Sequence, residues 1–600
     1  GPSASTFSQY QTAVWQILET VAYTKGAHAF KFGLDYRWYQ LNSIAPPNPT
    51  GSFAFTTTGT NQQGVTNSGN AIASFLLGQV DTFQIDLQES KIRPRAHIQE
   101  YFAQDDWKAT NRLTLNLGAR WTLHFPSTEK NNQGAVFDLD TQQLNYLGVD
   151  GFSRSARELH FGNVAPRIGL AYMLTPKTVA RSGFGIVFID QSGITTPFTT
   201  PQFPFIQSVQ QKTQDSLRPT FALSTGPDVA PIPFTPDAGL GQSVYTANRT
   251  AGSGYVEQWN LALQREITSN LSAEVAYVGS HIVHVGIPDA NLNQLTVEQL
   301  AEGAPLLQSV PNPYYGELPA SSSIGGKNIS QAQLIKPYPR FLNVAIYRNN
   351  SGTTNYNAVE AKVQQRLSHG LSFLFAYTHS KLIDDASAVF STTVLSSPNS
   401  NSLIAADSHR PWLERDSSSG DIPNVTSFSG IWDLPAGRGH RFASGGLANH
   451  VLGGWTFNTM LLLQSGMPVT VTQSTNFNSF AGFSLQRPNL VGRPSLSPGE
   501  RTPARYFNTG AFAVAPQFTL GSASRNPVRG PAYRDLDIAL VKHFTLPREA
   551  SLEFRAEMFN VTNTPAFAQP NGSFGAAAFG SITSTVTDPR VMQLALRISR

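Results

Sequence analysis

Apolar and polar residues alternate strictly along many short segments of this chain. Between residues 113 and 121 every second residue is apolar, while Asn116 and Arg120 occupy intervening positions. The same period recurs at residues 552–558 and 592–598. A period of two is that of a β-strand with one face buried. Further segments with this period are Phe30–Trp38, Trp259–Leu263, Val359–Val363, Leu371–Tyr377 and Leu536–Leu540.

Connections of two very different lengths join these segments. Tight turns are predicted at Lys25–Gly26, Thr110–Asn111, Pro176–Lys177, Ser269–Asn270, Ser368–Gly370 and Pro547–Ala550, with one longer Gly-rich connection on the same side, Pro435 to Val451. Long connections are Asn42–Pro94, Phe125–Val164, Gln191–Gly254, Gly286–Thr354, Asp384–Pro423, Ser465–Tyr533 and Thr564–Arg590. This pattern predicts an all-β fold, a large antiparallel transmembrane β-barrel with short periplasmic turns and long extracellular loops. Such a barrel lies in the outer membrane.

The composition agrees with a membrane wall made of strands. Charged residues make up 14% of the chain and aromatic residues 11%, whereas about 25% of an ordinary soluble protein is charged. No run of apolar residues is long enough for a membrane-spanning helix. The absence of cysteine excludes disulfides and thiolate metal sites. A formal charge of +4, scattered along the chain, argues against a nucleic-acid partner.

Successive strands of such a barrel run alternately outward and inward, so the number of strands determines the side on which each end of the chain lies. We expect about 15 strands, of which the first descends near Thr12–Tyr23 and the last, Val591–Arg600, leaves the C-terminus in the periplasm. An odd count does not close a bacterial barrel, and large transporters have about 22 strands. We therefore expect roughly the first seven strands to lie outside this chain. The parity holds only if Ala71–Ser90 lies inside a loop.

Tryptophan residues give a second indication of the membrane boundaries. Trp38, Trp121 and Trp259 fall near the expected outer ends of strands, and Trp432 and Trp455 near the inner ends. This placement is typical of two aromatic girdles. The alternative is tryptophan packed in an ordinary β core. Trp107 lies beside the inner group, on a strand of ambiguous parity.

Segments along nearly the whole chain resemble the barrel of the TonB-dependent outer-membrane receptors, in the Oar-like branch with a carboxypeptidase-regulatory-like N-terminal domain. They are QDDWKATNRLTLNLGARW (104–121), APRIGLAY (165–172), RSGFGIVF (181–188), YVEQWNLALQREI (255–267), NYNAVEAKVQQRLSHGLSFLFAYTHSKLIDD (355–385), WDLPAGRGHRF (432–442), LQSGMPVTV (463–471), YFNTGAFA (506–513), SLEFRAEMFNVTNTPAF (551–567) and the terminal RVMQLALRIS. The resemblance implies that residues 1–600 are the C-terminal majority of the barrel. The plug, the regulatory-like domain and the TonB-interacting segment are not recognised in this chain. The last residue is Arg600, where such barrels commonly end in an aromatic residue.

The resemblance also implies a function for the intact protein. It would bind a scarce or bulky solute at its outer loops and import it when energy from the inner membrane displaces the plug. The implied partners are outer-membrane lipid and lipopolysaccharide, the TonB complex through the N-terminal part, and an unidentified extracellular solute. Two other functions remain open, an outer-surface structural or adhesion protein and a passive pore.

No residue pattern indicates catalysis or a cofactor. A G-x-S-x-G nucleophile motif is absent, so we expect no enzyme and assign no catalytic, metal or substrate-binding residue. Gly169, Gly183 and Gly185 lack the phosphate-loop pattern and are interpreted as strand glycines. His281 and His284 are spaced by three, which places them on opposite faces of a strand.

Several charged positions allow two interpretations. Inward-facing charges are predicted at Glu360, Lys362, Asp535, Asp537, Glu553, Arg555, Glu557 and Arg597. They form either a ladder of opposite charges on neighbouring strands or contacts to a plug or solute. For the carboxylate pairs Asp105–Asp106 and Asp384–Asp385 we expect hydrogen bonds to a turn or rim rather than a calcium site.

The loop Gln191–Gly254 is rich in Pro, Phe and Thr, with TTPFTTPQFPFIQ from Thr195 to Gln207. Its aromatic rings can stack on sugars or peptides, because long loops on a rigid scaffold concentrate binding residues. Alternatively, the rings form a small core of the loop itself over the barrel mouth.

Overall fold

A computed structural model describes residues 9–44, 46, 48–62, 68–189, 203–212, 219–227, 229, 231–287, 290–320, 322–347, 349–385, 405–437, 442, 445–546 and 550–599. A single antiparallel sheet forms the wall, with fifteen strands paired in chain order. They are β1 (Gln9–Lys25), β2 (His28–Ile44), β6 (Pro94–Trp107), β7 (Leu113–Glu129), β10 (Val164–Thr175), β11 (Thr178–Phe188), β15 (Tyr255–Thr268), β16 (Leu271–Val285), β21 (Gly352–Ser368), β22 (Leu371–Asp384), β24 (Asn424–Asp433), β25 (Trp455–Gln464), β31 (Tyr533–Thr545), β32 (Ser551–Phe559) and β34 (Val591–Ser599). A sixteenth short strand, β23 (Asp416–Ser417), pairs with β22.

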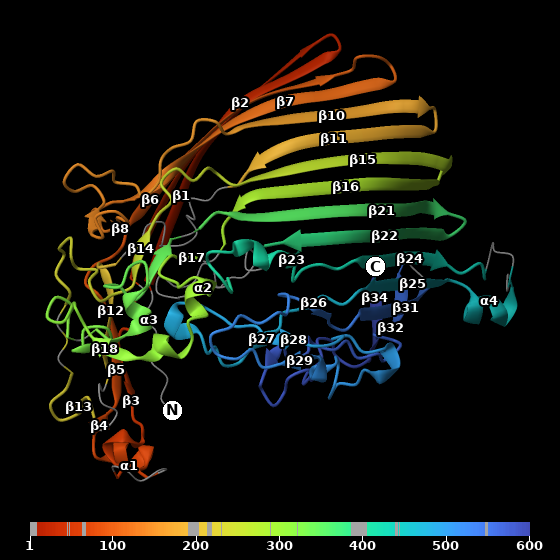
Figure 1. The fold of residues 1–600 in the computed structure, drawn as a ribbon. Helices are drawn as coiled ribbons and strands as arrows, with labels where there is room; N and C mark the ends of the chain where they lie inside the picture. The colour runs from red at the N-terminus through yellow and green to blue at the C-terminus, as the bar shows by residue number, and fades with distance from the viewer. Residues whose placement is uncertain are drawn as a thin grey trace.

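The wall confirms the predicted fold class and the predicted strand order. Figure 1 shows the tight turns at one end of the strands, on the right, and the cap formed by the N-terminal long loops at the other. The tight turns within the described part of the chain join consecutive strands where they were expected; residues 547–549 of the turn at Pro547–Ala550 lie outside the described residues. The segment Ala71–Ser90 lies in a loop, as the parity required, and holds α1 (Ala71–Leu76) and the whole of β5 (Thr82–Gln88), which pairs with loop strands. The expectation of about 22 strands in the intact barrel stays a prediction.

The strands tilt steeply across the wall. A line of directly paired residues starts at Lys25, at the tight-turn end of β1, and reaches Asn424, at the loop end of β24. The residues between them on this line are His28, Trp107, Leu115, Leu170, Ser182, Leu261, Tyr277, Val359 and His379. Strands that close into a barrel must be staggered in this way.

One face of the wall is apolar and exposed. Leu261 is 59% exposed and Val359 50%, and both lie on the line of paired residues. Their neighbours Asn260 and Glu360 point to the opposite face, because successive side chains of a strand alternate. We call the apolar face the lipid face and the other the lumenal face. No helix among the described residues is long and apolar enough to cross a bilayer.

The long loops carry the remaining elements and form a cap. Its strands are β3 (Ser52–Ala54), β4 (Gln79–Val80), β8 (Ala135–Phe137), β9 (Leu144–Tyr146), β12 (Ile206–Lys212), β13 (Phe221–Ala222), β14 (Val244–Thr246), β17 (Ala290–Asn291), β18 (Ser309–Pro311), β19 (Asn328–Ser330), β20 (Val344–Ile346), β26 (Pro468–Val469), β27 (Thr472–Gln473), β28 (Asn489–Leu490), β29 (Phe512–Ala513), β30 (Val528–Arg529) and β33 (Ser573–Phe574). Its α-helices besides α1 are α2 (Val297–Leu300) and α3 (Gln331–Leu334), and its 3-10 helices are η1 (Thr57–Gly59), η2 (Ala304–Leu307), η5 (Pro411–Glu414), η6 (Ser479–Ala481), η7 (Pro498–Glu500) and η8 (Thr509–Ala511). A further helix, α4 (Gly446–Leu452), lies at the tight-turn end.

The apolar cores of this chain lie in the cap. Three separate clusters of buried side chains form: one around Phe137 and Phe341, one around Phe507 and Phe512, and one around Leu300. The loop Gln191–Gly254 contributes to them: Ile206 is buried beside Ile92 and Tyr347. In the described part of that loop, Phe203 and Phe205 pack against the clusters around Phe341 and Ile92, so these rings join cores shared with other loops rather than a core of the loop itself; residues 195–202 lie outside the described residues.

Tryptophans mark the tight-turn edge of the lipid face. Trp432 is the penultimate residue of β24 and Trp455 the first of β25, as predicted. At the loop end of the wall, strands continue beyond the tryptophans. For example, β2 runs past Trp38 to Ile44. Trp107 pairs with His28 and its ring stacks on the imidazole at 5.3 Å.

Candidate functional site

The lumenal face carries a network of opposite charges on three neighbouring strands. Arg37 of β2 lies 2.6 Å from Glu100 of β6, and Arg120 of β7 lies 2.8 Å from the same carboxylate oxygen. Asp35 adds a contact of 3.3 Å to Arg37. These positions follow from the alternation, since they lie opposite the apolar residues, but they were not among the predicted inward charges. They hold neighbouring strands together on the side that faces water.

Of the predicted inward charges, those on β32 pair mainly within their own strand. Arg555 contacts Glu553 and lies 3.9 Å from Glu557. The cross-strand partner of Glu553 is His543, at 3.6 Å. Glu553 also lies directly opposite Arg597 of β34, as the predicted cross-strand ladder requires. Pairs within β32 are added to it, because residues two apart on one strand share a face.

The other predicted inward charges differ in their contacts. Asp537 accepts a hydrogen bond from the amide of Asn560 at 2.8 Å, and the Tyr533 hydroxyl donates to Asp535 at 3.3 Å. No ion pair within the described residues involves Glu360, Lys362 or Arg597. Arg597 nevertheless lies directly opposite Glu553 in the register, and Glu360 and Lys362 face the lumen.

A groove on the lumenal face has the size of a ligand site. It encloses about 700 Å³ along β21, β22, β24, β25, β31 and β32, within the range of roughly 300–1,000 Å³ that ligand pockets occupy. Its apolar lining includes Leu374, Ile431 and Met460, which are 38%, 52% and 64% exposed. Gln364, Ser372, Ser429, Asn458, Asp537 and Glu557 add polar groups. Alternation places these polar and apolar side chains side by side on one wall.

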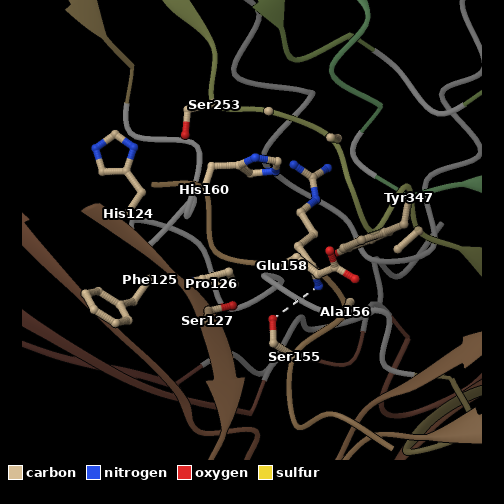
Figure 2. A pocket seen from close by; sticks show the side chains of 14 residues that line it. His124, Phe125, Pro126, Ser127, Ser155, Ala156, Glu158, His160, Ser253 and Tyr347 are labelled. Carbon is tan, nitrogen blue, oxygen red and sulfur yellow. Dashed lines mark hydrogen bonds between the residues drawn. The ribbon is translucent and has the colours of Figure 1, made fainter. Parts of the chain in front are cut away.

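A second, smaller pocket lies at the barrel mouth, between the outer end of β7 and the loops (Figure 2). It encloses about 60 Å³ and is lined by His124, His160, Glu158, Ser253 and Tyr347 among others. Within it the amide of Arg157 donates to the Ser155 hydroxyl at 3.2 Å. This volume suits a few water molecules or a small ion, and it is too small for a bulky solute.

Buried polar contacts lock the cap loops to one another. The guanidinium of Arg525, in the loop after β25, pairs with Asp384 at the outer end of β22, and Arg487 pairs with Glu414. Asp421, which is fully buried, accepts from the amide of Leu382 at 2.6 Å. Burial works to raise the pKa of Asp421, but hydrogen bonds from Leu382, Arg529 and Lys381 outweigh it and lower the pKa.

Of the two carboxylate pairs predicted to bond to turns or rims, Asp384–Asp385 does so, and Asp105–Asp106 bonds to side chains of neighbouring strands. Asp384 pairs with Arg525, and Asp385 accepts from the amide of Thr353 at 2.7 Å. At the other end of the wall, the imidazole of His28 contacts Asp105 at 2.7 Å. Asp106 accepts from the side chain of Asn116 at 2.5 Å. The prediction is confirmed for Asp384–Asp385 and wrong in the partners of Asp105–Asp106.

The histidine and glycine positions singled out in the sequence lie in the wall. His281 lies 3.6 Å from Glu257, and His284 has a positive φ of 56° where the pairing with β21 shifts register. No group of three or more His, Asp or Glu side chains in the described part of the chain is arranged to hold a metal ion. Gly183 and Gly185 lie within β11, as expected for strand glycines.

Comparisons with known proteins agree with this architecture. A family model described as an outer membrane beta barrel domain matches residues 1–593. A comparison with curated proteins gave no match. Solved structures with a similar chain include the outer membrane transporter YddB from Escherichia coli, with 10% identity, a TM-score of 0.47 and coverage of 98% of this chain and 54% of that one.

Two other similar structures are those of receptors. The ferripyoverdine receptor of the outer membrane of Pseudomonas aeruginosa has 10% identity and a TM-score of 0.42, over 98% of this chain and 48% of that one. The siderophore receptor PiuA from Acinetobacter baumannii has 9% identity and a TM-score of 0.42, over 98% and 56%. The chain spans about half the length of the solved structures it matches.

Proposed function

The chain belongs to the outer membrane beta barrel domain family, and from this premise we propose that it forms the wall and binding loops of a TonB-dependent receptor of the Oar-like branch. The family is one of membrane barrels and not of enzymes, and its place is the cell outer membrane. In this proposal the extracellular loops bind a solute. The lumen then conducts it when TonB-coupled energy displaces a plug.

The lumenal groove is the observation that carries this proposal. A wall that served only as a surface scaffold needs no ligand-sized groove on its inner face. Here about 700 Å³ of space lies against exposed Met460 and Ile431, with carboxylates of Asp537 and Glu557 close by. Exposed apolar side chains among polar ones on a concave wall are what a plug or a passing solute requires.

The edges of the sheet support the proposed place of residues 1–600 in a larger barrel. β1 and β34 end the order of paired strands, and open sheet edges are not tolerated in the hydrocarbon region. We therefore place these residues as the C-terminal majority of the barrel, closed by further strands between β34 and β1. A plug and an N-terminal regulatory-like domain complete the intact protein in this proposal.

Uptake measurements on the intact protein test the transport function. Cells that lack the protein are compared with cells that lack TonB, using radiolabelled ferric siderophore, oligosaccharide, peptide and cobalamin as probes. A shared loss of uptake of one probe is the expected result. Open ion conductance of the intact protein in planar bilayers would indicate a passive pore. Normal uptake with reduced cell adhesion would indicate the surface role.

A pair of adjacent variants on β25 tests the part played by the lumenal groove. Met460 faces the lumen and Leu461 faces lipid, since neighbouring side chains alternate. Met460→Trp places a larger, rigid ring in the groove and is expected to reduce uptake of the responsive probe, whereas Leu461→Trp leaves uptake near normal. Equal uptake by the two variants would exclude a role for the groove.

A further inference from the structure

The longest connection at the tight-turn end of the described wall carries a helix with exposed apolar side chains. Helix α4 lies between β24 and β25, at the end where the other connections are tight turns (Figure 1). Leu447 is 84% exposed, Val451 62% and Leu452 54%. Leu447 and Val451 are spaced by four and share one face of the helix, and Leu452 lies roughly 100° further round from Val451. The half-buried Asn449 lies on the opposite side, near Gly437 and Gly453.

The C-terminal end of α4 is clamped to the lipid face of the wall. The amine of Lys542 donates to the carbonyl oxygens of His450 at 2.6 Å and Val451 at 2.7 Å. The indole Nε1 of Trp455 donates to the same Val451 oxygen at 2.8 Å. The last carbonyl groups of a helix lack intrahelical partners and attract a cation. Lys542 therefore fixes both the position and the end of α4.

The register shows on which face this clamp lies. Trp455 pairs with Lys542, and Phe457, on the same face of β25, pairs with Trp432. Trp432 and Phe428 share one face of β24. The register through β22 and β21 shows that this is also the face of the exposed Val359. The amine of Lys542 also lies 5.1 Å from the Trp455 ring centroid and 4.9 Å from that of Phe544. The clamp is thus on the lipid face, at its tight-turn edge.

We propose that α4 lies in the periplasmic leaflet of the outer membrane and is an interfacial lipid anchor. Lys542 and Trp455 hold its C-terminal end against the lipid face, and Trp432 of the same face is 42% exposed. Tryptophan favours the membrane interface, and amphipathic helices lie there with their apolar face among the acyl chains. The buried Lys542 keeps the helix at this depth. A second protein and another segment of this protein are the other occupants that the apolar face admits.

Single-cysteine labelling tests this proposal, because the chain contains no cysteine. Leu447→Cys and Val451→Cys are labelled with nitrobenzoxadiazole and reconstituted in liposomes of phosphatidylethanolamine and phosphatidylglycerol with or without brominated acyl chains. The matched control is Ser269→Cys, an exposed position in the tight turn between β15 and β16. We expect blue-shifted emission for both α4 labels and at least threefold stronger quenching by brominated lipid than for the control.

Two other outcomes of the labelling experiment would contradict the proposal. Emission and quenching equal to those of Ser269→Cys would place α4 in water. Blue-shifted emission without quenching would show that protein covers the apolar face. The clamp is tested by adding Lys542→Met to Leu447→Cys: the quenching should fall to the level of the control, while the resistance of the barrel to heat in detergent gels is kept. Unchanged quenching would refute the role of Lys542.

Discussion

At the scale of single residues, the cap depends on a few buried charges that pair across long stretches of chain. Asp384 is 2% exposed and Glu414 5% exposed, and each pairs with an arginine from the loop after β25. Removing a charge from water is costly, and only a close partner offsets the cost. The main contribution of each arginine to stability is therefore to offset the cost of burying its carboxylate partner.

Loss of the Arg525 charge should destabilise the cap strongly. Arg525→Met removes the Arg525 charge from the buried Asp384, and we expect a loss of about 3–5 kcal/mol in local stability. Hydrogen exchange of segment 465–532 measures this loss. The control is Arg340→Met, which breaks the more exposed pair with Glu317 and should cost less than about 1 kcal/mol. Equal protection in the two variants would contradict the prediction.

The buried Lys336 should make the cap more stable as pH rises. Burial lowers the pKa of Lys336 from 10.5 to about 8. Between these values the folded chain has released the proton that the unfolded chain still binds, so stability increases with pH in this window. At pH 7 the folded chain carries the cost of the buried charge. We therefore expect Lys336→Met to stabilise the cap at pH 7 by up to about 3 kcal/mol.

Thermal unfolding of the cap in detergent at pH 7 and pH 9.5 measures this effect. The wild-type chain should gain stability between the two pH values, and Lys336→Met should show a smaller gain. The exposed Lys327 supplies the control variant Lys327→Met, which should keep the wild-type pH dependence. The same pH dependence in Lys336→Met as in wild type would refute the role of Lys336.

At the scale of elements, glycines in the wall make room for aromatic rings on neighbouring strands. The ring of Trp259 on β15 lies directly over Gly279 of β16, and the two residues are paired. Phe102 lies over Gly33 of β2 in the same manner. A side chain at either glycine would occupy the space of the ring. At these two positions of the wall, only glycine leaves enough space for the ring on the neighbouring strand.

Replacing Gly279 by valine should destabilise the wall, whereas the same replacement of Gly185 should not. Gly279→Val forces Trp259 out of its position, and overpacking of this kind costs about 1–3 kcal/mol. Gly185 of β11 is the matched control, because a Cβ there meets atoms only at 3.8 Å. The temperature at which each barrel loses its compact form in detergent gels measures the difference. A lower temperature for Gly185→Val than for Gly279→Val would contradict the prediction.

At the scale of the whole molecule, the bilayer distinguishes the two faces of the wall. Side chains of both faces are exposed in the isolated chain, but one face is apolar and the other carries charges. The lipid face carries the line of paired residues from Lys25 to Asn424. The lumenal face carries the Arg37, Glu100 and Arg120 network and the groove. A charge should therefore be tolerated on one face and excluded from the other.

Adjacent residues in the middle of β15 test this difference directly. Leu261→Arg places a cation on the lipid face near the middle of the strand, and we expect a loss of about 2–4 kcal/mol in unfolding from liposomes. Asn260→Arg places the same cation in the lumen and should be nearly neutral. Guanidinium unfolding followed by tryptophan fluorescence measures both variants. Similar losses for the two would place the described wall outside a bilayer.

Much of the wall could be predicted because its signals are local. A period of two, a tight turn such as Thr110–Asn111 and a long loop can each be recognised within some tens of residues. The cap could not be predicted in the same way. Helix α1 was missed, because six residues give too little periodicity to recognise. For Asp384 a hydrogen bond at the rim was expected, but its partner Arg525 lies 141 residues away in the chain.

The sequence by itself determined the strands, their order, the side on which each loop lies and the face that each side chain presents. These properties follow from alternation and chain direction, which do not depend on distant contacts. The tertiary structure decided which residues meet: the clamp of Lys542 on α4, the paired charges of the cap, and the groove formed by six strands. Such contacts depend on the stagger of the strands and on loop packing, which join residues far apart in sequence and leave no local pattern.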